Sequence, residues 1–197
     1  MKIRMKMKII ITLILSHIFV TFSLAQSDYM EALKWCNSRQ KVQSQECMID
    51  ENIFDFQGET IEGEMIDIGA LKGKVLVINF WFISCHPCMA EIKGLNEIVD
   101  RYQGRDDVKF ISFTLNNQKE LDQLFFPKHQ FKFEIIADAG TFLLDEIQHG
   151  WGYPTTFVVD KAGKIKKIIC GGSTGEEEAT IKVKEELIPI LDSLLEK

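Results

Sequence analysis

Residues 75–95 have the sequence VLVINFWFISCHPCMAEIKGL. The first seven of them, Val75–Trp81, are nearly all apolar and rich in β-branched and aromatic side chains, which predicts a strand buried on both faces. Apolar side chains then recur at three- and four-residue spacing from Met89 to about Tyr102, which predicts a helix. Cys85 and Cys88 lie between this strand and this helix. The junction is therefore the first candidate for a chemically active site.

The Cys-x-x-Cys pair at this junction is typical of a redox centre. Such a motif beside a strand–helix–strand pattern favours thiol–disulfide chemistry. Cys85 is expected at the helix N-terminus, where unpaired N–H groups and the helix dipole stabilise a thiolate. Cys88 follows about one helical turn later, within reach of a mixed disulfide at Cys85. Pro87 suits a helix start, because the first turn needs no hydrogen-bonded N–H.

His86, between the two cysteines, has two interpretations. A protonated imidazole would stabilise the Cys85 thiolate and make the disulfide more oxidising. The alternative is an exposed spacer with little effect. A zinc site at the two cysteines would need two further ligands, and the sequence has no second Cys-x-x-Cys and no His-x-x-His. We therefore expect neither a metal nor another cofactor.

The rest of the C-terminal part alternates between strands and helices. Strands are expected at 108–115, 133–137, 156–159 and 164–170, and helices at 119–126 and 176–197, the last kinked or split by Pro189. Strand–helix alternation implies parallel pairing with right-handed crossovers, whereas the turn at residues 160–163 joins the last two strands as a hairpin. The prediction is an α/β domain at residues 52–197, with a central mixed β-sheet flanked by helices.

The first 25 residues differ in character from the remainder. A basic start, residues 2–8, precedes the mostly apolar run 9–24, and the small residues around Ala25 suit a signal peptidase. We interpret residues 1–25 as a signal peptide that is cleaved after Ala25, so that the mature chain is exported. A retained membrane anchor is the alternative, although the apolar run is short for a span of about 20 residues.

The predicted mature chain is acidic. Without residues 1–25 it has 19 Lys and Arg against 29 Asp and Glu, a formal net charge of −10. Binding to nucleic acid requires cations that neutralise phosphates. We therefore expect no nucleic-acid partner.

All five cysteines lie after the predicted cleavage site, and export would let disulfides form. Residues 26–51 are expected to be an N-terminal extension with a short helix, in which Cys36 and Cys47 flank a polar stretch. A structural disulfide between these two is one interpretation, and the sequence alone does not fix the pairing. Cys170 ends an apolar strand, and we expect a buried small hydrophobe there rather than a third redox thiol.

Two motifs together resemble the TlpA/ResA-like thiol–disulfide oxidoreductases of the thioredoxin superfamily. They are residues 75–95 and residues 152–157, the second followed by residues 158–160 and Gly163. The resemblance covers roughly residues 52–197. It implies a thioredoxin-like fold and an enzyme of the periplasm or cell envelope that exchanges protein thiols and disulfides. Several members of the branch serve cytochrome c biogenesis, and a membrane or periplasmic electron donor is implied.

The same resemblance assigns roles to single residues. It implies that Pro154 is cis and faces the cysteine pair, with Tyr153 beside it. Ser84 departs from the Trp that often precedes the first cysteine. Asn79 replaces the buried aspartate with which thioredoxin transfers protons, a replacement that also occurs in this branch. Glu91 matches the branch pattern C-x-P-C-x-x-E, and it either relays protons to the second cysteine or is an ordinary solvated helix residue.

Two functions of other classes remain open beside a reductase of protein disulfides. Thiol peroxidases share the fold but approach the reactive cysteine through P-x-x-x-T/S-x-x-C, and Ile78 stands at the proline position here. A non-catalytic binding module would use residues 26–51 to dock a partner, and the intact Cys-x-x-Cys argues against it. The motif does not set the direction of electron flow.

Overall fold

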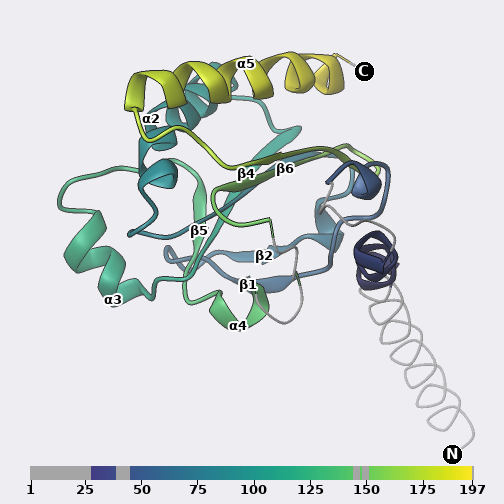
Figure 1. Cartoon of the computed structure of the whole chain (residues 1–197), viewed down its shortest axis with the longest axis horizontal. Helices are drawn as coiled ribbons and strands as arrows, with labels where there is room; N and C mark the ends of the chain where they lie inside the picture. The colour runs from purple at the N-terminus through teal and green to yellow at the C-terminus, as the bar shows by residue number, and fades with distance from the viewer. Residues whose placement is uncertain (1–27, 39–44, 144–146, 148–150, 197) are drawn as a thin grey trace, which may run out of the picture.

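The structure, a computed structural model, describes residues 28–38, 45–143, 147 and 151–196 (Figure 1). The predicted signal peptide, residues 1–25, and the polar stretch 39–44 lie outside the described residues. No helix in the part of the chain that the structure describes is long and apolar enough to cross a membrane.

A five-stranded mixed sheet with the order β5-β4-β3-β6-β7 forms the centre of the molecule. The strands are β3 (Val75–Trp81), β4 (Val108–Thr114), β5 (Glu134–Ile136), β6 (Thr155–Val159) and β7 (Ile165–Cys170). β3 pairs in parallel with β4 and antiparallel with β6, and β6 and β7 form the predicted hairpin. The mixed sheet expected from the sequence is confirmed.

A small antiparallel sheet precedes β3. It consists of β1 (Gln57–Glu59) and β2 (Met65–Asp67), and the single turn η2 (Gly69–Leu71) follows it. The N–H of Ile61, in the connection between β1 and β2, donates to the carbonyl of Ile135 in β5 at 2.9 Å. The hairpin thereby covers part of the edge of the main sheet.

Helices cover both faces of the main sheet (Figure 1). α2 (His86–Arg101) and α5 (Glu176–Leu195) pack together on one face. The helical segment 28–38, η1 (Gln45–Met48) and α4 (Gly140–Phe142) supply residues to the core on the other face. All seven residues of the central strand β3 are therefore buried.

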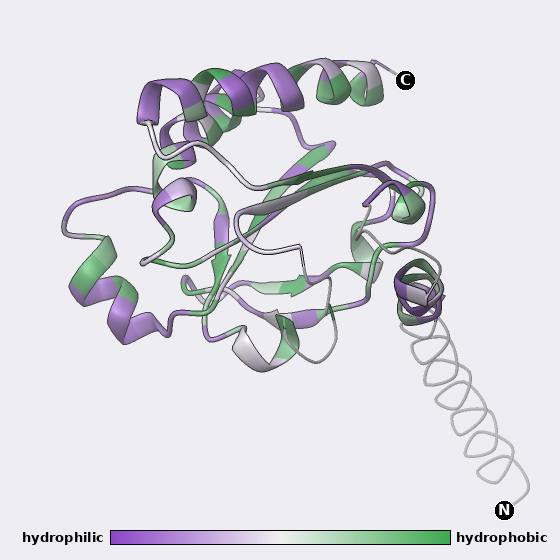
Figure 2. Ribbon diagram, viewed as in Figure 1, coloured by the Kyte–Doolittle hydropathy of each residue, from purple (hydrophilic) through white to green (hydrophobic). Residues whose placement is uncertain are grey.

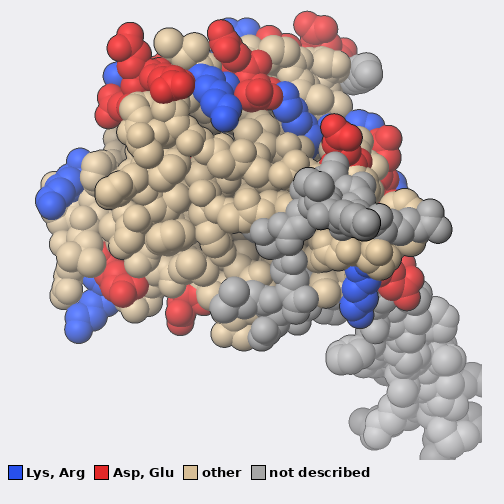
Figure 3. Space-filling model, in the orientation of Figure 1, with Lys and Arg blue, Asp and Glu red and all other residues tan. Residues whose placement is uncertain are grey.

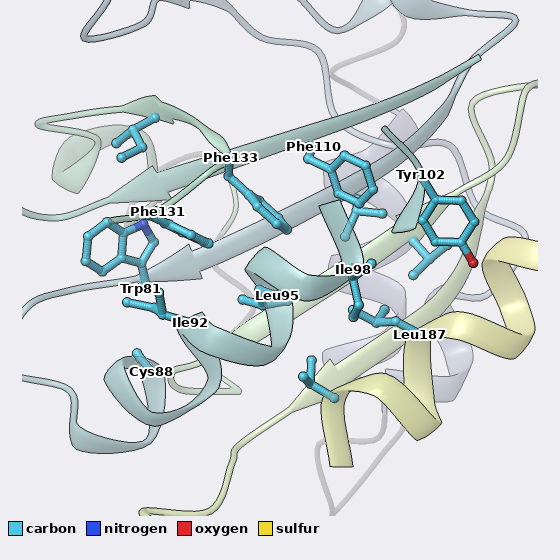
Figure 4. Packing of buried hydrophobic residues seen from close by; sticks show 14 of the residues in the cluster. Trp81, Cys88, Ile92, Leu95, Ile98, Tyr102, Phe110, Phe131, Phe133 and Leu187 are labelled. Carbon is cyan, nitrogen blue, oxygen red and sulfur yellow. The ribbon is translucent and has the colours of Figure 1, made fainter. Parts of the chain in front are cut away.

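Alternate residues of β3 divide between two cores, because successive side chains of a strand point to opposite faces. Val75, Val77 and Trp81 belong to the core under α2 and α5, where Leu95 and Ile98 of α2 also lie (Figure 4). The intervening apolar residues of β3 belong to the second core. Figure 2 shows hydrophobic and hydrophilic residues alternating along α5. The buried residues recur every four positions and form an apolar stripe: Ala179, Val183, Leu187, Leu191 and Leu195.

The charged residues of α5 stabilise the packing of α5 on α2 less than its apolar residues do. Figure 3 shows that charged side chains on this face of the molecule gather over α5 and along the edges. Ion pairs join the two helices at Lys93–Glu176 (3.2 Å) and Lys184–Glu97 (2.7 Å). Pairs this exposed contribute only about 0–1 kcal/mol each. Burial of apolar surface is thus the main attraction between α2 and α5.

The second core combines a cluster of aromatic rings with aliphatic side chains, and the N-terminal extension contributes residues to it. Tyr29, Leu33 and Cys36 recur at four- and three-residue spacing and form the buried side of the helical segment 28–38. The Tyr29 ring packs edge-on against Phe54, with centroids 5.6 Å apart. Cys36 and Cys47 are joined by a disulfide, with Cα atoms 5.8 Å apart.

Two helices differ from the sequence prediction. α5 is continuous through Pro189, so of the predicted kink or split, the split is wrong. Pro189 has no N–H to donate to the Glu185 carbonyl, but Glu185 and Pro189 both lie on the exposed side of the helix, so this carbonyl is not buried without a partner. The single helix expected at 119–126 is instead a three-residue α-helical turn, α3 (Gln118–Glu120), followed by a π-helical turn, η3 (Leu121–Phe125).

Candidate active site

The Cys-x-x-Cys motif lies at the N-terminus of α2. β3 ends at Trp81, residues 82–84 turn the chain, and Cys85 is the N-cap residue with extended backbone angles, φ −85° and ψ 98°. The helix begins at His86, so Cys85 lies at its N-terminus and Pro87 in its first turn, as expected, three residues before the apolar pattern that starts at Met89.

Cys85 and Cys88 are joined by a disulfide, with Cα atoms 5.2 Å apart. The backbone N–H of Cys88 donates to Cys85 Sγ at 3.2 Å. Cys85 is 6% exposed and Cys88 1%, so Cys85 is the more accessible residue of the two. In the reduced state, a Cys85 thiolate would meet this N–H donor and the positive end of the helix dipole, both of which favour the charged form.

The second sequence motif folds next to the first. The Tyr153–Pro154 peptide bond is cis, as the family resemblance implies. A Cβ atom added to Gly172 would lie 3.4 Å from both Pro154 Cγ and Pro87 Cβ. The N–H of Gly171 donates to the Pro154 carbonyl at 2.8 Å. The cis-proline loop, the end of β7 and the Cys-x-x-Cys motif therefore meet at one place.

An aromatic pair connects the turn before Cys85 with the cis-proline loop. Phe82 packs edge-on against Tyr153, with ring centroids 5.3 Å apart and an interplanar angle of 84°. Burial raises the pKa of Tyr153, so its hydroxyl stays neutral. His86, in contrast, is exposed. Phe82 and Gly172 were not among the predicted site residues. Their signals in the sequence are a ring three residues before Cys85 and a Gly-Gly pair directly after a strand.

A buried polar network lies on the α2 face of the sheet. Asn79 Nδ2 donates to Glu91 Oε1 and to Thr156 Oγ1, both at 2.9 Å. Burial raises the pKa of Glu91 to about 8, while the Asn79 hydrogen bond and the charge of Lys182 lower it. Glu91 is only 6% exposed, so its interpretation as a solvated helix residue is wrong. The Glu91 carboxyl is therefore mainly protonated at neutral pH. Glu91 lies about one helical turn after Cys88 in α2, so the two residues are on the same side of the helix.

The remaining cysteines belong to the opposite face of the sheet. Cys36 is part of the second core and Cys47 packs against it. Cys170 of β7 is opposite Thr155 of β6, and Thr155 is opposite Phe80 of β3. Directly opposite residues point to the same face of a sheet, so Cys170 points to the face of Phe80, which belongs to the second core. Cys170 was expected to be buried and is only half-buried. This partial burial raises the pKa of its thiol. The structure does not bring it to the Cys85–Cys88 pair.

The fold and this site define a class of protein: thioredoxin-like α/β domains with a cysteine pair at a helix N-terminus beside a cis-proline loop. A solved structure agrees. StoA from Bacillus subtilis superimposes with a TM-score of 0.53 at 28% identity, covering 66% of this chain and 94% of that chain.

Two further comparisons identify the family. Residues 49–168 match the model of the AhpC/TSA family. The thiol-disulfide oxidoreductase ResA of Bacillus thuringiensis (strain Al Hakam) is 30% identical over 177 residues, which are 89% of this chain and 93% of that protein. ResA of Geobacillus thermodenitrificans is 32% identical over 126 residues, 62% of this chain and 70% of that protein. The chain therefore belongs to the AhpC/TSA family and is a ResA-like thiol–disulfide oxidoreductase.

Proposed function

We propose that this oxidoreductase is an exported reductase of protein disulfides, and that Cys85 and Cys88 perform its dithiol–disulfide cycle. The observation that supports the proposal most strongly is the position of Cys85. It caps α2, accepts the Cys88 N–H at 3.2 Å and is more exposed than Cys88. These features favour Cys85 as the attacking thiolate and Cys88 as the thiol that resolves the mixed disulfide.

The proposed reduction proceeds in two exchanges. The Cys85 thiolate attacks one sulfur of the substrate disulfide and displaces the other as a thiolate, which takes up a proton. Cys88 then loses its proton, attacks Cys85 Sγ and displaces the remaining substrate sulfur. Two electrons pass from the cysteine pair to the substrate, and the Cys85–Cys88 disulfide forms. A membrane or periplasmic electron donor then reduces the pair again.

Glu91 is proposed to exchange the proton of Cys88. Burial raises the pKa of Glu91 to about 8, which is close to the pKa of a free thiol, about 8.5. A carboxyl with a pKa near neutrality can both take up and return a proton at the pH at which the exchange takes place. The hydrogen bond from Asn79 holds the carboxyl in place on the sheet side of α2.

The residues around the pair are proposed to tune it and to meet the substrate. His86 is exposed next to Cys85 in the chain, and its protonated form would stabilise the thiolate. Pro87 and Pro154 both approach Gly172, and Tyr153 borders the same place. A substrate segment that reaches Cys85 would run along these side chains.

We further propose that residues 1–25 are a cleaved signal peptide, residues 26–51 an N-terminal extension and residues 52–197 the thioredoxin-like domain. The mature chain would then work in the periplasm or cell envelope, with cytochrome c biogenesis as the process that the family resemblance implies. The basic and apolar segments of the N-terminus support export. N-terminal sequencing of chain recovered from the cell envelope should begin at Gln26; a start at Met1 would favour the anchor.

The reduction potential of the Cys85–Cys88 pair tests the direction of electron flow. The mature chain is equilibrated in defined thiol buffers and alkylated, and peptide masses separate this pair from Cys36–Cys47. A potential near that of thioredoxin, about −270 mV, would support the reductase. A potential near that of the oxidant DsbA, about −120 mV, would point to disulfide formation instead. A pair that does not titrate would overturn the redox function.

A further inference from the structure

The side chain of Asn116 holds the turn between β3 and α2 from the neighbouring strand. β3 and β4 pair in parallel as far as Trp81 and Thr114. The next backbone bond runs from the Leu115 N–H to the Trp81 carbonyl at 3.4 Å. Beyond it, the Ile83 N–H donates to Asn116 Oδ1 at 2.8 Å. A side-chain oxygen thus takes the place of a backbone carbonyl just past the end of the sheet.

Asn116 is itself fixed by its other polar groups. Its Nδ2 donates to Glu120 Oε2 at 3.1 Å, and the same carboxylate oxygen accepts the Asn117 N–H at 3.0 Å. Asn117 and Glu120 form the capping box of α3. The backbone carbonyl of Asn116 accepts the Asp138 N–H at 2.8 Å. Because both ends of the amide are used, turning it over would break both side-chain bonds.

The tethered turn leads directly into the redox centre. Ile83 is two residues before Cys85, and the Cys85 N–H closes the turn on the Phe82 carbonyl at 3.1 Å. The position of this turn therefore decides where Cys85 Sγ lies relative to the Cys88 N–H. Stabilisation of a charge by a helix N-terminus falls off within the first turn, so a small displacement of the sulfur weakens it.

We propose that Asn116 is a positioning residue of the redox centre: by accepting the Ile83 N–H, it keeps Cys85 where the start of α2 stabilises the thiolate. The inference rests on the proposed function of Cys85. Through its bonds to Ile83 and Glu120, Asn116 also connects the turn before Cys85 to the start of α3. Asn116 lies outside both the Cys-x-x-Cys motif and the cis-proline loop.

The test compares Asn116→Ala with Asn96→Ala. Asn96 is a matched control, since its amide also accepts a backbone N–H and donates to an oxygen: it accepts the Lys132 N–H at 2.8 Å and donates to the Gln130 carbonyl at 2.7 Å. It lies on α2 about three turns after Cys85. The readout is the rate at which iodoacetamide alkylates Cys85 in the reduced chain as a function of pH, assigned by mass spectrometry. The free energy of unfolding is measured in parallel.

Asn116→Ala should raise the apparent pKa of Cys85. Below that pKa it should slow the alkylation of Cys85 about fivefold, the factor that corresponds to about 1 kcal/mol for one hydrogen bond. Asn96→Ala should leave the pH profile of alkylation unchanged while it lowers stability by a similar amount. An unchanged profile in Asn116→Ala would overturn the proposal, and so would an equal shift in both variants.

Two further measurements keep the test decisive. Asn116→Asp combined with Glu120→Gln keeps an oxygen for the Ile83 N–H and a donor–acceptor pair between positions 116 and 120 at unchanged net charge, so its profile should match the wild type. A profile like that of Asn116→Ala would contradict the proposal. If the alanine variant does not fold, hydrogen exchange at the Ile83 amide of the wild type replaces it. Protection supports the tether, and exchange at the rate of an unstructured chain overturns it.

Failure of the proposed function would look different from failure of this inference. It would be visible in the wild type itself, as a Cys85–Cys88 pair that does not exchange with any protein disulfide. The positioning role of Asn116 fails only if the wild-type pair exchanges and the alkylation profile of Asn116→Ala is unchanged.

Discussion

Replacing Glu91 by glutamine should remove a pH dependence of stability that the burial of this carboxyl creates. Burial raises the pKa of Glu91 to about 8 from an ordinary value of 4.5. Between these two pH values, the folded chain keeps a proton that the unfolded chain has released. Stability therefore falls as the pH rises, by about 1.4 kcal/mol for each pH unit. Below the unfolded pKa both states are protonated and the penalty is absent, and above about pH 8 it is complete.

The size of the effect follows from the same two pKa values. A difference of about 3.5 units corresponds to an upper limit of about 5 kcal/mol. Relaxation around the ionised carboxylate and entry of water reduce this figure, so a loss of about 2–5 kcal/mol is expected between about pH 5 and pH 9. Glutamine has nearly the same shape, stays neutral at every pH and keeps an oxygen for the Asn79 amide.

Urea unfolding of the oxidised wild-type and Glu91→Gln chains at about pH 4, 7 and 9 measures the effect. The difference between the two chains should shift by about 2–5 kcal/mol in favour of Glu91→Gln between the lowest and the highest pH. Titration of all other groups cancels in this difference, and the lowest pH is the internal control because both states then bind the proton. Parallel pH dependences of the two chains would refute the argument that Glu91 is a buried, protonated acid.

Three shorter predictions concern packing and the other cysteines. A Cβ at Gly94 would lie 2.5 Å from Val183 Cγ1. Gly94→Ala should therefore push α2 away from α5 and lower the free energy of unfolding by about 1–3 kcal/mol. A Gly94→Ala chain as stable in urea as the wild type would contradict this packing. Replacing Cys36 and Cys47 together by serine should lower the free energy of unfolding by about 2–4 kcal/mol, while the Cys85–Cys88 pair still exchanges. Unchanged stability would mean that the Cys36–Cys47 disulfide does not stabilise the folded chain. Cys170→Ser should leave the rate of disulfide exchange unchanged because Cys170 faces the second core, and a large loss of rate would assign it a redox role.

The local pattern of the sequence was enough to locate the strands of the main sheet and the redox motif. β3 is a short apolar run, and Cys85 lies at a strand–helix junction with a proline in the first helical turn, so both depend on neighbouring residues alone. The cis bond at Pro154 came from a family resemblance and not from the local pattern.

The parts of the site that the sequence did not reveal depend on contacts between distant segments. Glu91 is buried because α2 lies on the sheet, where Asn79 of β3 and Thr156 of β6 meet it. The closeness of Gly172 to Pro87 joins residues 85 positions apart in the chain. The continuity of α5 through Pro189 likewise depends on which side of the helix meets solvent, and helical spacing alone did not exclude a break.

The most direct test of the central claim is to trap the mixed disulfide. Reduced chains without residues 1–25 that carry Cys88→Ser or Cys85→Ser, both with Cys170→Ser to remove the free thiol, are mixed with a disulfide-bonded protein, quenched in acid and examined by mass spectrometry. If Cys85 is the attacking thiolate, a stable mixed disulfide forms through Cys85 in the Cys88→Ser chain and little or none forms in the Cys85→Ser chain. Equal trapping through Cys88, or no trapping in either chain, would contradict it.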